Sequence, residues 1–155
     1  MSRAFVNEDS FVEELPDRTV SQHPNLVTER GLAQIEETIE AVRGEYARAQ
    51  AAADRGALAK AGRDLRYWSA RRSSAKVTNP RPEKDTVQFG SAVTIVRDDG
   101  RRQTFRIVGE DEADPSSGSI SHVAPLARAL LGKRIGEVVR AGNADAEITA
   151  IRNEI

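Results

Sequence analysis

The 155-residue sequence has no cysteine, two histidines and few aromatic residues. Without cysteine it can form no disulfide, no thiolate nucleophile and no zinc–sulfur site. His23 and His122 are too few for a multi-histidine metal site. Aromatic residues make up 5% of the chain, so we expect a mainly aliphatic core. The composition therefore excludes thiol chemistry and a multi-histidine metal centre.

Long apolar runs are also missing. No stretch approaches the about 18 apolar residues that cross a bilayer, so we expect no membrane span. Residues 1–5 lack the apolar segment of a signal peptide, and we expect a cytoplasmic protein. Hydrophobic residues make up 39% of the chain and charged residues 30%. These values suit one mid-sized domain, or a small domain with an extended element.

Charge is distributed unevenly, although the net charge is −1. Residues 1–27 carry two basic and five acidic groups, whereas residues 54–76 carry seven basic and two acidic groups. Ion pairing within the molecule and solubility are one interpretation of the basic segment. The other is a surface attracted to nucleic acid or to an acidic channel.

Residues 32–75 are predicted to form an antiparallel coiled-coil hairpin, because apolar positions recur at alternating spacings of three and four. In the first arm these are Leu32, Ile35, Ile39, Val42, Tyr46, Ala49 and Ala53; in the second they are Leu58, Ala61, Leu65, Trp68 and Ala75, with Arg72 in the one missing slot. Thr28 is the expected N-cap. Gly56 is expected to supply a positive φ at a reversal near residues 54–57. A single kinked helix or two helices of an ordinary bundle are the alternatives.

Pro80 and Pro82 end the helical region and mark a domain boundary. We therefore predict an α+β chain of four parts. They are a flexible acidic tail over residues 1–25, a hairpin over 26–78, a linker over 79–86 and a C-terminal domain over 87–155.

The C-terminal domain is predicted to be a compact antiparallel sheet with one short helix. Its expected strands lie within residues 87–96, 104–108, 136–139 and 146–151, with a further short strand from Ile120. Residues 98–100, Asp-Asp-Gly, are a hairpin turn signal. The helix is expected over 126–131, with Pro125 at its first position and Gly132 just after its end.

Signals for chemistry are weak. Residues 110–114 form an acidic loop that could hold a divalent cation, but they lack the spacing of a Ca²⁺ loop, and a solvated turn is the better interpretation. Ser121 and His122 adjoin, so on a strand they face opposite ways and form no nucleophile–base pair. Tyr67 and Trp68 could stack on a base, although Trp68 falls on the hairpin seam and suits core packing. We expect no catalytic residue, no metal site and no cofactor.

Several short motifs follow one another in the second half of the chain. They are Ile-Val-Gly at 107–109, Glu-Ala-Asp at 112–114, Ile-Ser at 120–121, Pro-Leu-Ala-Arg-Ala-Leu-Leu-Gly-Lys at 125–133 and Ile-Gly-Glu-Val-Val at 135–139. These motifs resemble the C-terminal domain of the bacterial Gre transcript cleavage factors, the GreA/GreB family. Residues 27–32 are similar to the start of that family's coiled coil. The resemblance covers roughly residues 26–155.

The resemblance implies an FKBP-like C-terminal domain that docks at the rim of the secondary channel of RNA polymerase. It also implies that the coiled coil enters this channel toward the active centre. The docking segment corresponds here to Ile120, Ser121, His122, Ala124, Pro125 and Leu126. Ala124 stands where the family usually has serine. The implied partner is RNA polymerase, with nucleic acid contacted through the polymerase complex, and we expect a monomer.

The hairpin tip departs from the family. The family motif is Gly-Asp-Leu-x-Glu-Asn, whose two acids help to hold a second Mg²⁺ and its attacking water. Here residues 56–61 read Gly-Ala-Leu-Ala-Lys-Ala, so Ala57 and Lys60 replace both acids. An ammonium group repels a cation, and only Asp54 remains nearby. The tip residues are Asp54, Arg55, Gly56, Ala57, Leu58 and Lys60. The arms also look about one heptad short, or roughly 10 Å.

We therefore expect a Gre-like regulator of transcription elongation that acts through the secondary channel with weak or no stimulation of transcript cleavage, and that is not itself an enzyme. One alternative is a short-hairpin Gre-like binding module with a non-polymerase partner, such as an enzyme of nucleotide metabolism. A prolyl isomerase is another, but it needs an aromatic-lined pocket, and residues 77–155 offer only Phe89 and Phe105. The last alternative is direct binding of nucleic acid through the basic arm, which predicts an affinity that falls steeply as the salt concentration rises.

Overall fold

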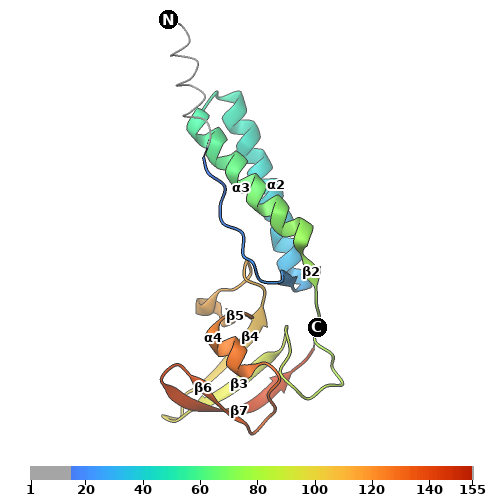
Figure 1. Cartoon of the computed structure of the whole chain (residues 1–155), viewed down its shortest axis with the longest axis vertical. Coiled ribbons are helices and arrows are strands. Elements are labelled where there is room, and N and C mark those ends of the chain that lie inside the picture. The colour runs from blue at the N-terminus through green and yellow to red at the C-terminus, as the bar shows by residue number, and fades with distance from the viewer. Residues whose placement is uncertain (1–14, 155) are drawn as a thin grey trace, which may run out of the picture. The chain divides into compact units, whose positions relative to one another are not determined.

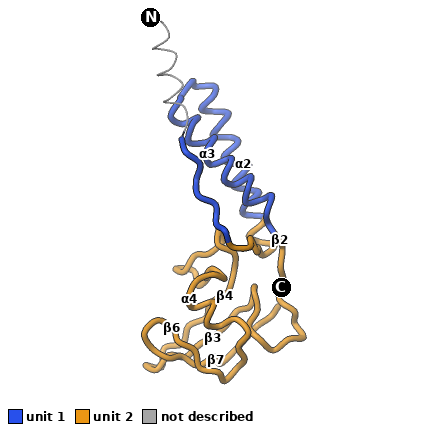
Figure 2. Tube along the Cα trace, in the orientation of Figure 1, with its two compact units in different colours: residues 1–22, 33–75 blue, residues 23–32, 76–155 orange. Residues whose placement is uncertain are grey.

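The computed structural model describes residues 15–154, which form two long helices, one short helix and seven strands (Figure 1). The chain divides into two compact units (Figure 2). One unit contains the residues up to 22 together with 33–75, and the other contains residues 23–32 and 76–155. The predicted hairpin, 26–78, thus contributes its base to the C-terminal unit.

Helices α2 (Glu29–Ala51) and α3 (Arg55–Ser74) lie side by side and form the predicted hairpin (Figure 1). The stripe of the first arm is buried as expected at Ile35, Ile39, Val42 and Ala49. Ala61 is the buried apolar residue of α3. Supercoiling of the two helices stays a prediction.

Arg72 does not fill the missing apolar position of the second arm, so its assignment to the buried seam was wrong; the buried arginine of α3 is Arg71. Arg71 is 1% exposed, whereas the side chain of Arg72 is 57% exposed and lies 3.8 Å from Glu36. Arg71 shares a side of α3 with Asp64 and Tyr67, because residues three and four apart are neighbours on a helix. Arg18 contacts this side of the helix at Asp64 and Tyr67, so the buried face of α3 extends beyond the apolar stripe.

The reversal between the arms does not use Gly56 in the predicted way. Gly56 lies inside the first turn of α3, and the positive φ, 51°, belongs to Ala53. Ala53 N donates to Gln50 O at 3.2 Å and Asp54 N donates to Ala49 O at 3.0 Å. This pair of bonds is a Schellman motif, whose left-handed residue is usually glycine. The helix therefore ends three residues earlier than a turn with its left-handed residue at Gly56 would require.

Ala53→Gly is expected to stabilise the hairpin by about 1 kcal/mol, because glycine adopts a positive φ without the steric cost that the Cβ of alanine carries. Thermal unfolding followed by helical circular dichroism measures this gain. Ala52→Gly is the matched control, because Ala52 lies beside Ala53 and is not among the positive-φ residues. A lower melting temperature for Ala53→Gly would contradict the assignment of the turn.

The base of the hairpin is tied into the C-terminal unit. Strand β1 (Leu26–Val27) pairs in parallel with β2 (Lys76–Val77), a pairing that the sequence did not predict. Gly31 N donates to Thr28 Oγ1 at 2.9 Å, which confirms the predicted N-cap. The same hydroxyl donates to Glu112 Oε1 at 2.5 Å. A side chain in the acidic loop thus supports the start of α2.

The sheet of the C-terminal unit has the strand order β5-β4-β3-β7-β6. Its strands are β3 (Ala92–Arg97), β4 (Arg102–Val108), β5 (Ser119–Ser121), β6 (Val138–Ala141) and β7 (Ala144–Arg152). All pairs are antiparallel except β4–β5, which is parallel, so the predicted purely antiparallel sheet was wrong. The connection from β4 to β5 is long enough to return the chain in the same direction, and it contains the 3₁₀ turn η1 (Pro115–Ser117).

The core of this unit is aliphatic, as the composition predicts. Its fully buried side chains are Val93, Ile95, Ile107, Val108, Leu130 and Ile148. Helix α4 (Pro125–Leu130) contributes Ala127 and Leu130 to this core. Pro125 begins the helix and Gly132 follows it with a positive φ, both as predicted. The likeness to an FKBP domain stays a prediction.

The acidic loop is a structural turn. Asp114 caps η1 and accepts hydrogen bonds from the hydroxyls of Ser116 and Ser117, each at 2.6 Å. These bonds hold the pKa of the Asp114 carboxyl below its usual value, since they favour the charged form. No cluster of three or more potential metal ligands occurs in residues 15–154.

Candidate functional site

The predicted tip residues lie at the N-terminal end of α3, from its N-cap, Asp54, into its second turn, where Lys60 lies. Asp54 is the N-cap of this helix, and its Oδ1 accepts a hydrogen bond from Ala57 N at 3.1 Å. Arg55, Gly56 and Ala57 are exposed, and Leu58 is half-buried. The only carboxylate among the predicted tip residues is therefore already engaged in holding the helix end.

Electrostatics at the tip do not favour a bound cation. A shallow groove of about 390 Å³ lies between the helix ends and contains the side chains of Glu45, Arg48, Asp54 and Lys60. Two basic groups thus line the same groove as two carboxylates. Lys60 Nζ also lies 3.8 Å from Asp64 Oδ2, one turn further along α3. Positive charge beside the carboxylates opposes the binding of a divalent ion.

The predicted docking segment runs from β5 into α4 in the C-terminal unit. Ile120 is buried in the core, and Ser121 and His122 are half-buried. Ser121 Oγ accepts from Val123 N at 3.3 Å, and the His122 ring lies edge-on to Phe89 with 5.4 Å between ring centroids. That Ser121 and His122 form no nucleophile–base pair stays a prediction.

The remaining docking residues form the start of α4. Ala124 is its N-cap residue and makes no side-chain capping bond. Pro125 is exposed at the first helical position, and Leu126 packs against the core. Pro125 is therefore the exposed member of the predicted docking segment, while Ile120 and Leu126 lie in or against the core. The role of these six residues in docking stays a prediction.

Ala124→Ser is expected to stabilise the C-terminal unit by about 1 kcal/mol, because a serine hydroxyl can accept a hydrogen bond from a free N–H in the first turn. Urea unfolding followed by circular dichroism measures this difference. Ala124→Val is the control, since valine adds side-chain atoms but no capping oxygen. If the serine and valine variants are equally stable, the first turn of α4 has no backbone N–H that lacks a hydrogen-bond acceptor.

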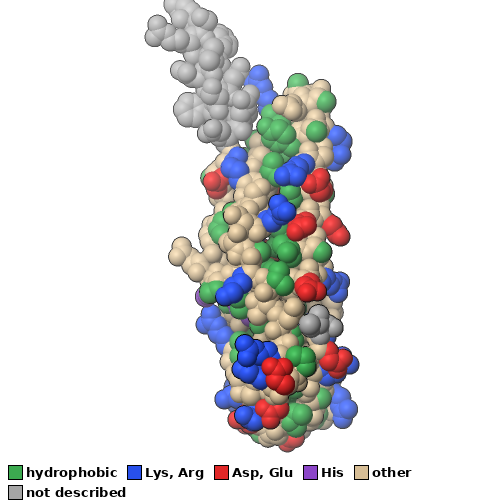
Figure 3. Space-filling view, turned by 90° about the vertical axis from the view of Figure 1, so that its right-hand side faces the viewer, with side chains coloured by type: hydrophobic (Ala, Val, Ile, Leu, Met, Phe, Trp, Pro, Cys, Tyr) green, Lys and Arg blue, Asp and Glu red, His purple; other side chains and the backbone are tan. Residues whose placement is uncertain are grey.

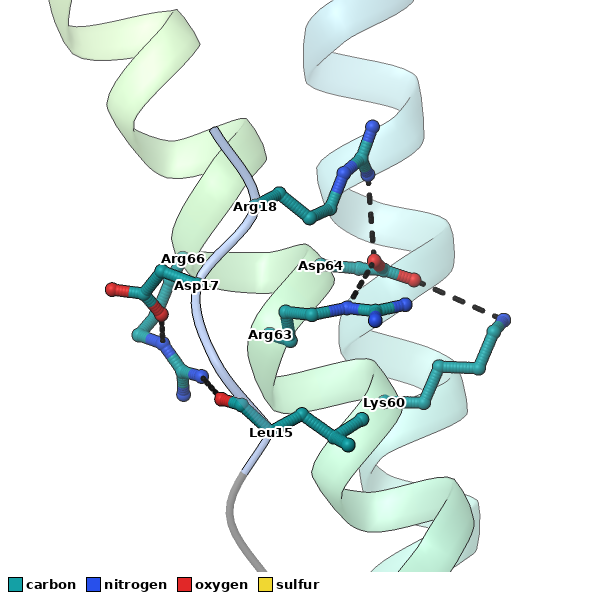
Figure 4. A network of polar contacts seen from close by, with 7 residues as sticks. All are labelled: Leu15, Asp17, Arg18, Lys60, Arg63, Asp64 and Arg66. Atoms are coloured by element: carbon teal, nitrogen blue, oxygen red, sulfur yellow. Dashed lines mark hydrogen bonds and ion pairs between the residues drawn. The ribbon is translucent and has the colours of Figure 1, made fainter. Parts of the chain in front are cut away.

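One feature of the molecule was missed by the sequence analysis. Residues 15–18, predicted as part of a flexible tail, contact α3 through Asp17 and Arg18 (Figure 4). Of the predicted tail, residues 1–25, only the first 14 lie outside the described residues. The signal that could have found the contact is the pattern of charges, because the Asp17-Arg18 pair is complementary to Asp64 and Arg66 two residues apart.

Basic and acidic side chains are interspersed on the face of the molecule drawn in Figure 3. No single large patch of one charge is visible on this view. None of the helices in the described part of the chain combines the length and apolarity that a membrane crossing needs.

Comparisons with known proteins find a family match in the C-terminal half of the chain. Residues 82–153 match the family model of the C-terminal domain of transcription elongation factors GreA and GreB. The chain is 44% identical over 79 residues to GreB from Neisseria meningitidis serogroup B, a match that covers 50% of this chain. It is 49% identical over 72 residues to GreA from Nitrobacter hamburgensis, which covers 43% of this chain. The chain spans about half the length of these curated relatives, 48% and 46%.

A solved structure is similar over a longer stretch. GreA factor homolog 1 (Gfh1) of Thermus thermophilus aligns with 84% of this chain and 99% of its own, at 19% identity and a TM-score of 0.42.

Proposed function

We propose that this chain, whose residues 82–153 match the C-terminal domain of the transcription elongation factors GreA and GreB, is a Gre-like regulator that binds RNA polymerase. In this proposal the protein acts through the secondary channel of the polymerase and stimulates transcript cleavage weakly or not at all. It has no catalytic activity of its own. The observation that carries the second part is the chemistry of the hairpin tip.

The tip lacks the acidic pair on which cleavage stimulation depends in the family that it resembles. Ala57 and Lys60 stand at the two acidic positions of the motif. Asp54 accepts a hydrogen bond from Ala57 N, so its carboxylate is oriented toward the helix end and its charge is partly compensated by the helix dipole. A single capping carboxylate beside Lys60 is a poor ligand set for Mg²⁺, which prefers several oxygen ligands in octahedral geometry.

The docking part of the proposal rests on the family match and on the exposed start of α4. Pro125 is exposed on a helix whose other side is anchored by Ala127 and Leu130 in the core. A rigid, partly apolar projection of this kind is suited to a protein partner, since little side-chain entropy is lost on binding. The alternative partner, an enzyme of nucleotide metabolism, has no support among the similar proteins.

Pro125→Asp is the variant that tests docking. Aspartate is favourable in the first turn of a helix, so α4 is expected to keep its structure while its surface gains a charge. We expect about tenfold weaker binding of the labelled protein to core RNA polymerase, as for a contact at the centre of an interface. Fluorescence anisotropy measures the affinity, and circular dichroism checks the fold.

Ile135→Asp is the matched control, because Ile135 is a large, exposed side chain in a turn of the same unit. Its affinity for the polymerase is expected to equal that of the unmodified protein. Equal binding by all three proteins would place docking elsewhere, and no binding by any of them would refute the proposed partner.

A further inference from the structure

The described N-terminal residues lie along α3 and pair with it through charge (Figure 4). Arg66 Nε donates to Asp17 Oδ1 at 2.6 Å, and Arg66 Nη2 donates to Leu15 O at 3.4 Å. Arg18 Nη1 donates to Asp64 Oδ1 at 3.4 Å. Asp64 also lies within ion-pair distance of Lys60 and Arg63. The extended segment thus occupies a face of α3 on which basic side chains predominate.

An aromatic side chain lies in the middle of this contact. The guanidinium carbon of Arg18 is 3.8 Å from the centroid of the Tyr67 ring, so the planar cation covers the face of the ring. The Trp68 ring lies edge-on to Tyr67, with 5.0 Å between centroids. Tyr67 is therefore a stacking surface that is held by its neighbour and occupied by Arg18.

Asp17 and Arg18 together present to α3 the same two kinds of group as a nucleotide, an anion and a flat stacking group. The Asp17 carboxylate takes the place of a phosphate on Arg66, and the Arg18 guanidinium takes the place of a base on Tyr67. Proteins that bind single strands without sequence preference combine these same elements, cations along the backbone and aromatic rings under the bases. We propose that Arg63, Arg66 and Tyr67 form a binding surface for single-stranded nucleic acid, which the N-terminal segment covers by acting as its mimic.

The contact of the N-terminal segment with α3 is weak enough for another ligand to displace the segment. The side chains of Arg66 and Asp17 are 54% and 72% exposed, and ion pairs at such exposure hold their partners only loosely. On this face Lys60, Arg63 and Arg66 accompany the single carboxylate of Asp64, so a polyanion gains more from it than the segment does. The balance of charge therefore favours a strand of nucleic acid over the segment at low salt.

Arg18→Ala separates this proposal from simple attraction of charge. Removal of a cation would by itself weaken binding to nucleic acid. Removal of the group that covers Tyr67 is instead expected to tighten binding by about threefold, the scale of one surface contact. The probe is a fluorescein-labelled 12-nucleotide oligo(dT), titrated with the full chain in 50 mM salt and followed by anisotropy. Arg140→Ala is the matched control, because it removes an exposed, ion-paired arginine from the other unit.

Tyr67→Ala in the Arg18→Ala background is expected to weaken binding by about tenfold, since a stacked base is lost. Circular dichroism confirms that the helices persist. Arg18→Ala binding no more tightly than Arg140→Ala, or a Tyr67→Ala substitution without effect, would overturn the proposal. Equally tight binding of labelled poly-glutamate would also overturn it, in favour of an acidic protein partner. The assay contains no polymerase, so its outcome is independent of the proposed function.

Discussion

Ile107→Ala is expected to lower the free energy of unfolding of the C-terminal unit by about 2–5 kcal/mol, the range found for large-to-small substitutions in well-packed cores. Ile107 lies in β4, the strand between β3 and β5, and its side chain is fully buried. The substitution removes three side-chain carbons and leaves a cavity that the flanking strands cannot close. Because domains of this size have total stabilities of about 5–15 kcal/mol, the loss is a large share.

Urea unfolding followed by circular dichroism in the strand region measures this loss. Ile135→Ala is the matched control, because Ile135 belongs to the same unit and is 61% exposed. Its effect is expected to stay within about 0.5 kcal/mol. Similar losses for both variants would mean that Ile107 does not lie in the core.

Gly109→Ala is expected to cost about 1–3 kcal/mol, the scale of an overpacked site, and to loosen the base of the hairpin. A Cβ at this position would lie 2.5 Å from the backbone oxygen of Leu26. Backbone cannot rotate away as a flexible side chain can, so β1 must move. The pairing of β1 with β2 depends on Leu26 and Val27 keeping their place.

Amide hydrogen exchange detects this movement. Thr78 N donates to Val27 O and Lys76 N donates to Asn25 O, each at 2.9 Å, and both amides are expected to exchange faster in the variant. Gly44→Ala is the control, because the new Cβ would meet only the flexible end of Arg48 in the interior of α2. It is expected to stabilise the helix by up to about 1 kcal/mol. Unchanged protection in Gly109→Ala would contradict the close approach.

The sequence predicted best those elements in which apolar residues recur at a regular spacing. The stripe through Ile35, Ile39 and Val42 indicated one buried helix face, and these side chains are buried. The turn signal at residues 98–100 correctly predicted the hairpin of β3 and β4, although β3 begins at Ala92 and not at residue 87. Capping also worked where the residue type is specific, as Thr28 shows.

The errors have physical causes that a local pattern does not contain. Strands β1 and β2 have two residues each, too few for any period. The parallel pairing of β5 depends on the path of the loop before it. The positive φ fell on Ala53 because the hydrogen bonds of the Schellman motif fix where α2 ends, and glycine at 56 could not move that end.

The candidate site was located through resemblance, and the structure supplied its local chemistry. The motif comparison identified Ala57 and Lys60 as departures at the tip, but it could not show that Asp54 caps α3. Composition alone suggested a tail where residues 15–18 contact the basic helix, because low hydrophobicity does not reveal ion pairs with a distant segment.

The central claim is that this protein engages the polymerase without an active tip. A transcript-cleavage assay on backtracked elongation complexes in Mg²⁺, with and without the protein and with a known cleavage factor as competitor, tests it most directly. Our account predicts no increase above the intrinsic cleavage rate of the polymerase, together with slower cleavage when the known factor is present. Clear stimulation by this protein alone would contradict the inactive tip, and an unaffected competitor would contradict docking at the secondary channel.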